Sequence, residues 1–496
     1  MANDCIGSYG PQSLFGRWVS FGVWLSRTMS EFLIYDTMAR APMPVRASDG
    51  VAVRLYCCGP TVYGPAHIGN FRTFVLQDVF RRIIEATGGE VRHVRNVTDV
   101  DDKTIRESQA EGRSLEDFTR EWKEKFHKDC RALNVLPPHD EPSAVAHIDD
   151  QVQLIETLME RGHAYRAEDG SVYFRVRSFE SYGRLSHLCE REITTDDAAR
   201  STADEYDRES ASDFALWKAR RPEDGPNYWE SPWGQGRPGW HLECSAMSMK
   251  LLGPSFDVHS GGVDLVFPHH ENEIAQSEAA TGQQFAERWF HIAHLMVDGT
   301  KMSKSLGNLY TLEELEGKGF TAEELRYTLQ SGSYRQPLNF TLESMHAARK
   351  ALARLRDFGE RIGHFEGSPR PGMEGFGPFS EVLGALLDDM NTPEALGRLF
   401  GTLKGLNKEL DEEVDSDRRR SIQEGFANAK RVLGLTLDAP AGGGEIPEAV
   451  VALARERWDA KQAKDWTKAD ELRGKLTEAG WQVKDAKDGF ELTPLE

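Results

Sequence analysis

The junction formed by residues 64–70, Gly-Pro-Ala-His-Ile-Gly-Asn, could bind a phosphate. It stands between an apolar segment and a helical pattern, where backbone N–H groups and the positive end of the helix dipole attract anions. His67 and Asn70 add side-chain donors, and Gly69 allows a ligand to come close to the backbone. On its own the motif has a plainer interpretation, because a histidine beside a helix start is often a cap or a packing residue.

Residues 298–308, Asp-Gly-Thr-Lys-Met-Ser-Lys-Ser-Leu-Gly-Asn, form a second candidate site for phosphate chemistry. Lys301 and Lys304 supply two point charges that could follow a departing pyrophosphate. The flanking glycines would let the loop close over it. An isolated motif of this kind has an alternative interpretation, a surface loop whose two lysines are only solvated.

Two cysteines, one histidine and one glutamate form a third candidate site, for a metal. Cys58 follows an apolar strand pattern, Cys244 lies in a Gly-Trp-His-Leu-Glu-Cys-Ser block, and His269 and Glu273 are four residues apart. On a helix begun by Pro268, the last two side chains would face the same way. Two thiolates, an imidazole and a carboxylate are typical zinc ligands, although separations this long cannot prove the set. Ligands gathered from distant strand ends indicate a site in an active cleft.

The periodicity of apolar residues predicts the strands and the helix that must position the first site. Residues 55–63 are short, apolar and closed by a Gly-Pro turn, which predicts a buried strand. From Ile68 the apolar residues recur at helical spacing until Gly88 and Gly89, and residues 91–97 return to a strand pattern. Strand, loop, helix and strand in this order are half of a doubly wound α/β domain.

Changes in pattern along the chain predict seven segments. These are a disordered extension or misassigned start (1–28), the first half of the α/β domain (29–150), a Gly, Ser and Asp-rich insertion (151–230), the second half of the α/β domain (231–340), a bundle of long amphipathic helices (341–438), a Pro and Gly-rich linker (439–449) and a small appended unit (450–496). In the second half we expect a core strand over 289–297. In the appended unit we expect one helix over 450–479 and a strand pair over 481–492.

Composition limits the function classes. The 496 residues are 39% hydrophobic and 28% charged, and no apolar run reaches the roughly 18 residues needed to cross a bilayer, so we expect a soluble, cytoplasmic protein with no membrane partner. The formal net charge of -20 means that a polyanionic partner must meet a local basic face. Six scattered cysteines favour a reducing compartment over a disulfide framework.

The motifs together are far more specific than each alone. His-Ile-Gly-Asn followed more than 200 residues later by Lys-Met-Ser-Lys-Ser resembles the signature pair of class I aminoacyl-tRNA synthetases. Four blocks narrow the resemblance to the cysteinyl-tRNA synthetase family, from about Met29 to the C-terminus: Cys57 to Tyr63, Thr98 to Lys103, Gly239 to Ser245, and Phe267 to Glu273. The resemblance implies a class I Rossmann-type doubly wound catalytic domain with an inserted connective subdomain, an α-helical bundle and a small C-terminal α+β domain.

The resemblance also implies roles for residues. One Zn²⁺ would be bound by Cys58, chosen over Cys57 because it precedes Gly59, with Cys244, His269 and Glu273. The residues implied to bind ATP or to catalyse are His67, Gly69, Asn70, Lys301 and Lys304, with Mg²⁺ accompanying ATP. The residues implied to line the amino-acid pocket are Thr98, Trp240 and Asp264. Zinc would select a soft thiolate over the hydroxyl of serine, a choice that shape alone makes poorly.

The implied reaction is that of a cysteine–tRNA ligase, with ATP, L-cysteine and tRNA(Cys) as substrates and a monomer as the working form. RNA contacts are expected from a basic helix and from the tail. The helix carries Arg349, Lys350, Arg354, Arg356 and Arg361, and a solvated face is its alternative. The tail combines cations with an aromatic residue able to stack on a base: Arg455, Arg457, Lys461, Lys464, Trp466 and Lys468.

Some residues depart from the family pattern, and other functions stay open. Asn70 replaces a histidine, and Tyr63-Gly64 and His259-Ser260-Gly261-Gly262 differ from the commonest versions. A cysteine ligase that passes its adenylate to an amino sugar, as in mycothiol synthesis, is the nearest alternative, and it would lack the tail unit. An inactive RNA-binding paralogue is another. A class I enzyme for methionine is disfavoured by the positions of the candidate zinc ligands.

Overall fold

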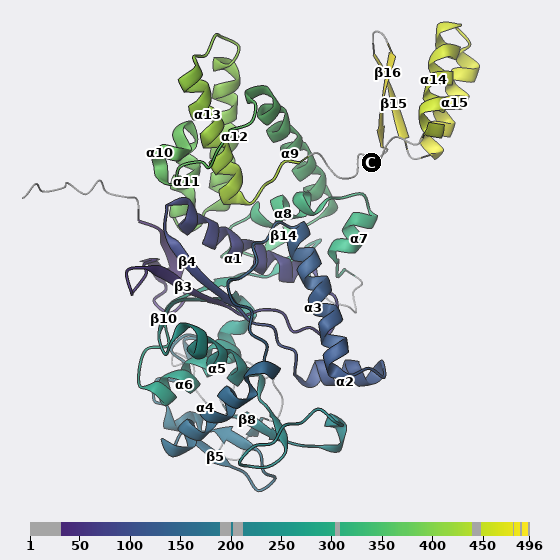
Figure 1. The fold of residues 1–496 in the computed structure, drawn as a ribbon. Coiled ribbons are helices and arrows are strands. Elements are labelled where there is room, and N and C mark those ends of the chain that lie inside the picture. Colours follow the sequence, from purple (N-terminus) through teal and green to yellow (C-terminus); the bar gives the residue numbers. More distant parts are fainter. Residues whose placement is uncertain are drawn as a thin grey trace, which may run out of the picture.

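A computed structural model describes residues 31–188, 200–201, 212–302, 308–438, 448–479, 481–486 and 489–494. Its centre is a four-stranded parallel sheet in the order β11-β10-β3-β4 (Figure 1). The strands are β3 (Ala52–Cys57), β4 (Glu90–Arg95), β10 (Phe256–Gly262) and β11 (Ala286–Ile292). From β3 the chain crosses to β4 on one side, and β10 pairs on the other side of β3. The carboxyl ends of β3 and β10 therefore form a topological switch point, where open α/β sheets bind ligands. The doubly wound fold predicted from the sequence is confirmed.

Helix α1 (Ile68–Ala86) connects β3 to β4 and covers the sheet. One face of it is apolar and fully buried, for example at Val75 and Val79, as its spacing predicts. Thr87 caps its C-terminus and Gly88 follows with a positive φ of 88°. The helix therefore ends where the two glycines predicted that it would.

The insertion between β4 and β10 has its own sheet and core. Its strands pair in the order β5-β6-β8-β7, with β9 beside β8. Buried Phe174, Phe214 and Trp217 pack there against the helix α4 (Ile148–Glu160). The strands are β5 (Ala164–Arg166), β6 (Val172–Phe174), β7 (Arg200–Ser201), β8 (Asp213–Ala219) and β9 (Gly236–Pro238).

The strand expected over 289–297 is two strands. β11 ends at Ile292, and β12 (Leu295–Val297) joins a different sheet with β13 (Thr300–Lys301) and β14 (Leu338–Phe340). The break occurs because Ala293 N–H donates to the carbonyl of Tyr334 and His294 C=O accepts from Leu338. These partners turn the chain away from β10 and toward the Lys301 region.

The long helices predicted after residue 340 form a bundle. Its core joins that of the sheet through residues such as Leu352, Phe358 and Phe426. The helices are α9 (Leu342–Ile362), α10 (Gly372–Phe376), α11 (Ser380–Leu387), α12 (Thr392–Glu409) and α13 (Ser416–Leu433). In the part of the chain that the structure describes, no helix is both long and apolar enough to cross a bilayer.

The basic face predicted on α9 is largely used inside the protein. Arg349 pairs with Glu324 at 2.7 Å, and Arg356 pairs with Glu323 at 2.8 Å. Arg361 pairs with Asp411 at 2.7 Å, and Arg354 lies over the ring of Phe400. These cations hold neighbouring elements together, so the structure favours a packing role over the predicted phosphate-binding face.

The appended unit contains two helices where one was expected. α14 (Glu448–Gln462) and α15 (Trp466–Glu478) are separated by a turn in which Lys464 has a φ of 62° and Asp465 caps the second helix. The predicted strand pair is present as β15 (Trp481–Ala486) and β16 (Gly489–Pro494). The remaining helices and strands are β1 (Leu33–Asp36), β2 (Ala41–Pro44), α2 (Asp102–Ala110), α3 (Leu115–Ala132), α5 (Trp240–Leu252), α6 (Glu271–Thr281), α7 (Leu312–Gly317) and α8 (Ala322–Gln330).

A buried ion network connects the catalytic sheet to the bundle. Asp78 of α1 accepts from Arg82 at 2.7 Å and from Arg326 of α8 at 2.5 Å. Both arginines also donate to carbonyls at the C-terminus of α13. Cations are stabilised there by the negative end of the helix dipole. Gly434 follows with a φ of 66°, and a Cβ there would come within 2.6 Å of three guanidinium atoms of Arg326. The network thus fixes the end of α13 against α1.

We predict that Arg326→Met lowers the free energy of unfolding by about 3 kcal/mol, because it leaves Asp78 buried with one partner fewer. Urea denaturation followed by tryptophan fluorescence measures this loss. Arg398→Met is the matched control, since Arg398 is half exposed in its pairs with Glu381 and Glu394 and should cost less than about 1 kcal/mol. Equal losses in the two variants would contradict the role given to the buried network.

Candidate active site

A cavity of about 260 Å³ opens at the switch point between β3 and β10. It reaches from the end of β3 to the first turn of α1 and the end of β10. Eight of the site residues predicted from the sequence line it: Cys58, His67, Asn70, Thr98, Trp240, Cys244, Asp264 and His269. Residues more than 200 positions apart are therefore brought into one cavity, as the predicted active cleft requires.

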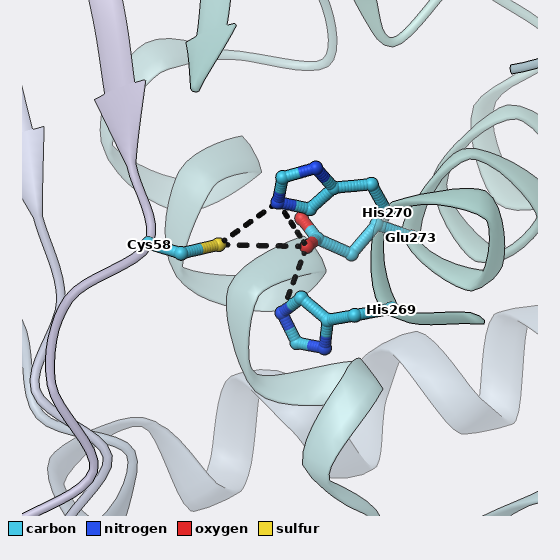
Figure 2. A group of neighbouring side chains, drawn as sticks. All are labelled: Cys58, His269, His270 and Glu273. Carbon is cyan, nitrogen blue, oxygen red and sulfur yellow. Dashed lines mark hydrogen bonds and ion pairs between the residues drawn. The ribbon is translucent and has the colours of Figure 1, made fainter. Parts of the chain in front are cut away.

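The predicted metal ligands meet at one end of this cavity. Cys58 Sγ lies 3.8 Å from Cys244 Sγ and 3.8 Å from Glu273 Oε1, and His269 Nε2 lies 3.0 Å from the same oxygen. All four residues are buried. Figure 2 shows Cys58 facing the histidines and Glu273 from across the site. Glu273 lies behind His269, outside the residues that line the cavity.

These separations fit a zinc ion. With bonds of about 2.3 Å to sulfur and 2.0 to 2.2 Å to nitrogen or oxygen, tetrahedral geometry places two sulfurs about 3.8 Å apart, sulfur and oxygen about 3.6 Å apart, and nitrogen and oxygen about 3.4 Å apart. Cys58, His269 and Glu273 are therefore compatible with a metal without large movement of their side chains. Cys244 lies beside Cys58 but is not among the four residues whose ligand atoms all fall within 4.8 Å of one another. His269 and Glu273 face each other as predicted, but α6 begins only at Glu271, because residues 266–270 form a π-helical turn with a non-helical backbone at Phe267.

His270 is a further donor that the sequence analysis missed. Its Nε2 lies 3.3 Å from Cys58 Sγ and 3.9 Å from Glu273 Oε1, and one ligand atom each from Cys58, His269, His270 and Glu273 all fall within 4.8 Å of one another. The adjacent His-His pair was the available signal. His269 and His270 both lie in a π-helical turn, Val266–His270, that runs directly into α6, and both side chains are buried beside Cys58 and Glu273.

Two of the proposed ligands are held deprotonated and two keep a proton. Burial raises the pKa of the Glu273 carboxyl, but His259 and His269 outweigh it and lower that pKa to about 2. A hydrogen bond from the Cys58 thiol lowers the pKa of Cys244 to about 6. Burial raises the pKa of Cys58 well above its usual value, and Glu273 and Cys244 outweigh burial at His269 and raise its pKa to about 10. A metal that binds here would displace a proton from Cys58 and from His269.

The predicted amino-acid pocket borders the metal cluster. Trp240 stacks on His269 with ring centroids 4.3 Å apart, which fixes both rings. Thr98 follows β4 and donates its hydroxyl to Glu243 at 3.1 Å. Asp264 follows β10 at the edge of the same cavity. A small zwitterion would thus meet polar groups from three elements.

The other end of the cavity is the first turn of α1. His67 Nδ1 accepts from the backbone of Asn70, and Asn70 Oδ1 accepts from the backbone of His67. This reciprocal cap is the plainer interpretation of the motif, yet both residues also line the cavity. A Cβ at Gly69 would lie 2.4 Å from the terminal methyl of Met302, so this glycine makes room for the second motif.

The second motif is described only in part. Lys301 is exposed at the end of β13, and Met302 reaches Gly69. Thr311, just after the motif, forms a backbone bridge with His67. Lys304 lies outside the described residues. The structure therefore brings the two motifs together at the start of α1 without describing the second lysine.

Comparisons with known proteins agree with this architecture. The tRNA synthetases class I (C) catalytic domain model matches residues 44–350, the DALR domain model matches 381–438, and the Cysteinyl-tRNA ligase anticodon binding domain model matches 443–491. Among solved structures, Mycobacterium tuberculosis methionyl-tRNA synthetase with methionyl-adenylate is similar at a TM-score of 0.53 and 14% identity, covering 77% of this chain and 89% of that one. The agnB2 LeuRS of Agrobacterium radiobacter K84, in a complex with tRNA and LeuAMS, has a TM-score of 0.55 and 12% identity, covering 78% and 83%. These two likenesses show the fold.

Relatives of nearly equal length are much closer in sequence. The Cysteine–tRNA ligase of Opitutus terrae is 53% identical over 471 residues, which are 93% of this chain and 99% of the relative. That of Chlamydia caviae is 43% identical over 483 residues, 95% of this chain and 99% of the relative. With catalytic, helical and anticodon-binding models matched in order, the chain belongs to the cysteinyl-tRNA synthetase family of class I aminoacyl-tRNA synthetases.

Proposed function

We propose that this chain is a cysteine–tRNA ligase, which activates L-cysteine with ATP and transfers it to tRNA(Cys). The observation that carries the proposal is one cavity with a buried Cys, His and Glu cluster, compatible with a metal, at one end and the start of α1 at the other. A thiol substrate and a nucleotide phosphate would each meet suitable chemistry there. Family membership supports the same assignment.

The first step joins cysteine to AMP. A carboxylate oxygen of cysteine attacks the α-phosphorus of ATP, the bond from that phosphorus to the bridging oxygen breaks, and pyrophosphate leaves. The amino end of α1, with His67 and Asn70, would stabilise charge on the phosphates, and Lys301 and Lys304 would follow the pyrophosphate. Mg²⁺ would accompany ATP. Catalysis of this kind depends mainly on positioning.

The metal cluster would hold the substrate's side chain. Cys58, Cys244, His269 and Glu273 are the ligands we propose for one zinc ion, and His270 is a fifth donor within reach. When bound, zinc would supply a soft acceptor that favours a thiolate over the hydroxyl of serine. Thr98, Trp240 and Asp264 would orient the rest of the amino acid.

The second step passes cysteine to RNA. The 2′-hydroxyl of the terminal ribose attacks the activated carbonyl and AMP leaves. The C-terminal unit would contact the anticodon, and Trp466, 58% exposed at the start of α15, could stack on a base there. Arg457 and Lys461 are less suited to RNA contact, because both pair with Asp485. A ligase acting on an amino sugar would have no use for this unit.

We predict that Cys58→Ala loses most bound zinc and at least about 100-fold of cysteine-dependent ATP–pyrophosphate exchange, since one sulfur ligand is removed. Cys57→Ala is the matched control. Cys57 is equally buried but packs in the hydrophobic core behind the sheet, so this variant should keep its zinc. Metal analysis and exchange assays measure both. The ligand assignment fails if the two variants lose zinc equally.

We predict that Asn70→Asp lowers kcat/KM for ATP by roughly 100-fold, because it replaces an amide donor near the phosphates by a negative charge. The carboxylate can still accept from the backbone of His67, so thermal stability should change little. Asn70→His should keep most of the activity. An unchanged kcat/KM in Asn70→Asp would show that Asn70 only caps the helix.

The proposed function is tested by offering two acceptors to the zinc-loaded wild type with cysteine and ATP. We expect transfer to tRNA(Cys) and none to glucosaminyl-inositol. Transfer only to the amino sugar would assign the chain to the small-molecule ligases. Bound zinc without pyrophosphate exchange would indicate an inactive RNA-binding relative.

A further inference from the structure

The cavity has an aromatic wall on the side of β3 and β4. This wall, the α3 wall, consists of Tyr63, Phe74, Lys103, Trp122 and Phe126. Tyr63 lies in the loop after β3, and Lys103 lies in the first turn of α2, after β4. Asp264 lines the cavity from the end of β10, on the other side of the switch point. The proposed reaction gives the α3 wall no ligand.

Aromatic neighbours hold Trp122 in this wall. Phe118, Trp122 and Phe126 recur every fourth residue, so they lie on one face of α3. Phe126 is buried against α1, with its ring centroid 6.1 Å from that of Phe71 and 5.0 Å from that of Phe74. Phe118 is also buried, and its ring meets the Trp122 ring at a steep angle with centroids 6.3 Å apart. Trp122 is therefore fixed between two buried turns of the helix.

Trp122 presents a hydrocarbon surface. The residue is only partly buried, but its indole nitrogen is buried and has no hydrogen-bond partner among the described residues. The accessible atoms of the Trp122 side chain are therefore carbons. A ligand that needs a hydrogen bond would have to move the ring, whereas a flat ligand can lie against it. Trp122 thus suits a ligand that binds by stacking.

A cation lies beside the aromatic rings. Lys103 Nζ is 5.8 Å from the ring centroid of Tyr63, and both residues line the cavity. Aromatic rings together with a cation suit a ligand that joins a flat base to a phosphate. In a chain with a net charge of -20, a local cation also offsets the repulsion of a polyanion.

Two substrates of the proposed reaction carry a flat base, ATP and tRNA. The proposed site for the phosphates of ATP is the start of α1 with Lys301 and Lys304, and it does not include Lys103. In a tRNA, a backbone phosphate directly precedes the terminal nucleotide, so a base and a phosphate arrive side by side. Unpaired RNA ends are commonly bound by stacking on aromatic side chains. The α3 wall therefore fits the end of an RNA chain better than the base of ATP.

We propose that the α3 wall binds the terminal nucleotide of the tRNA, with its base stacked on Trp122 and the preceding phosphate beside Lys103. Tyr63 is only four residues before His67, so a ribose held here is close to the start of α1, where the activated carbonyl would lie. The inference rests on the proposed function, because it takes tRNA as the acceptor. It gives the second step a binding site in the catalytic domain, separate from the C-terminal unit.

The test compares Trp122→Leu and Trp122→Phe with the wild type, all as zinc-loaded full chains. Charging is measured with tRNA(Cys) and with the same tRNA whose last nucleotide lacks its base but keeps both ribose hydroxyls. We expect Trp122→Leu to lower kcat/KM for intact tRNA at least about 10-fold, because stacking is lost, and Trp122→Phe to stay within about threefold. The wild type should lose a similar factor on the tRNA without the base. Trp122→Leu should then lose little more, because both changes remove the same contact.

Pyrophosphate exchange without RNA separates this role from a merely structural one. Exchange and the KM for ATP should stay within about twofold of the wild type in both variants. Trp229→Leu is the matched control, since Trp229 is also partly buried but packs in the core of the insertion, outside the residues that line the cavity. Its charging of tRNA should not change. A raised KM for ATP in Trp122→Leu would assign the wall to the base of ATP and overturn the inference.

The RNA measurements can also overturn the inference. An unchanged kcat/KM in Trp122→Leu would do so, as would normal charging of the tRNA without the base or multiplied losses when both changes are combined. If Trp122→Leu does not fold, Trp122→Met takes its place in the same comparison. A wild type that catalyses exchange but charges no tRNA would overturn the proposed function as well. Normal charging that depends on neither Trp122 nor the terminal base would overturn the inference alone.

Discussion

Burial of the Glu273 carboxylate among histidines and thiols is the interaction on which the active site depends. A fully buried carboxylate is costly unless cations and hydrogen bonds compensate it. Here His259 lies at 2.9 Å and His269 at 3.0 Å from its two oxygens. His259 comes from β10, His269 from the turn before α6 and Glu273 from α6 itself. The two sulfurs come from the residue after β3 and from α5. The cluster therefore forms only when the parallel sheet has its correct order. The fold therefore sets the geometry of the proposed metal site.

The same topology explains how two chemistries share one cavity. The chain leaves β3 toward α1 and leaves β10 toward α6, so the carboxyl ends of these paired strands border a crevice. Cys58 follows β3 directly, and α1 begins ten residues later with its positive end toward the same space. Asp78, Arg82 and Arg326 anchor the middle and the second half of α1 to the bundle, so the helix proposed to bind phosphate is also the one that positions α13.

Much of this could be predicted from the sequence. Periodicity gave the strand, helix and strand over 53–98, because each has one buried face, and the pairing of motifs indicated the candidate ligands. The rest depended on contacts that no local pattern contains. The break at Ala293 arises from distant carbonyl and amide partners, and His270 reaches the cluster from a π-helical turn that the apolar periodicity does not reveal. The arginines of α9 have the pattern of a phosphate-binding face, but their partners lie on α8, on α12 and just after α12. Lys304 is outside the described residues, so its ATP contact remains a prediction.

We propose that the buried cluster binds zinc and that this zinc accepts the substrate's thiolate. X-ray absorption at the zinc edge of the full chain, recorded with and without cysteine, tests it most directly. We predict two sulfur neighbours at about 2.3 Å in the free protein and a third when cysteine is added, with no change when serine is added. An unchanged sulfur count with cysteine, or a protein that takes up no zinc, would contradict the account.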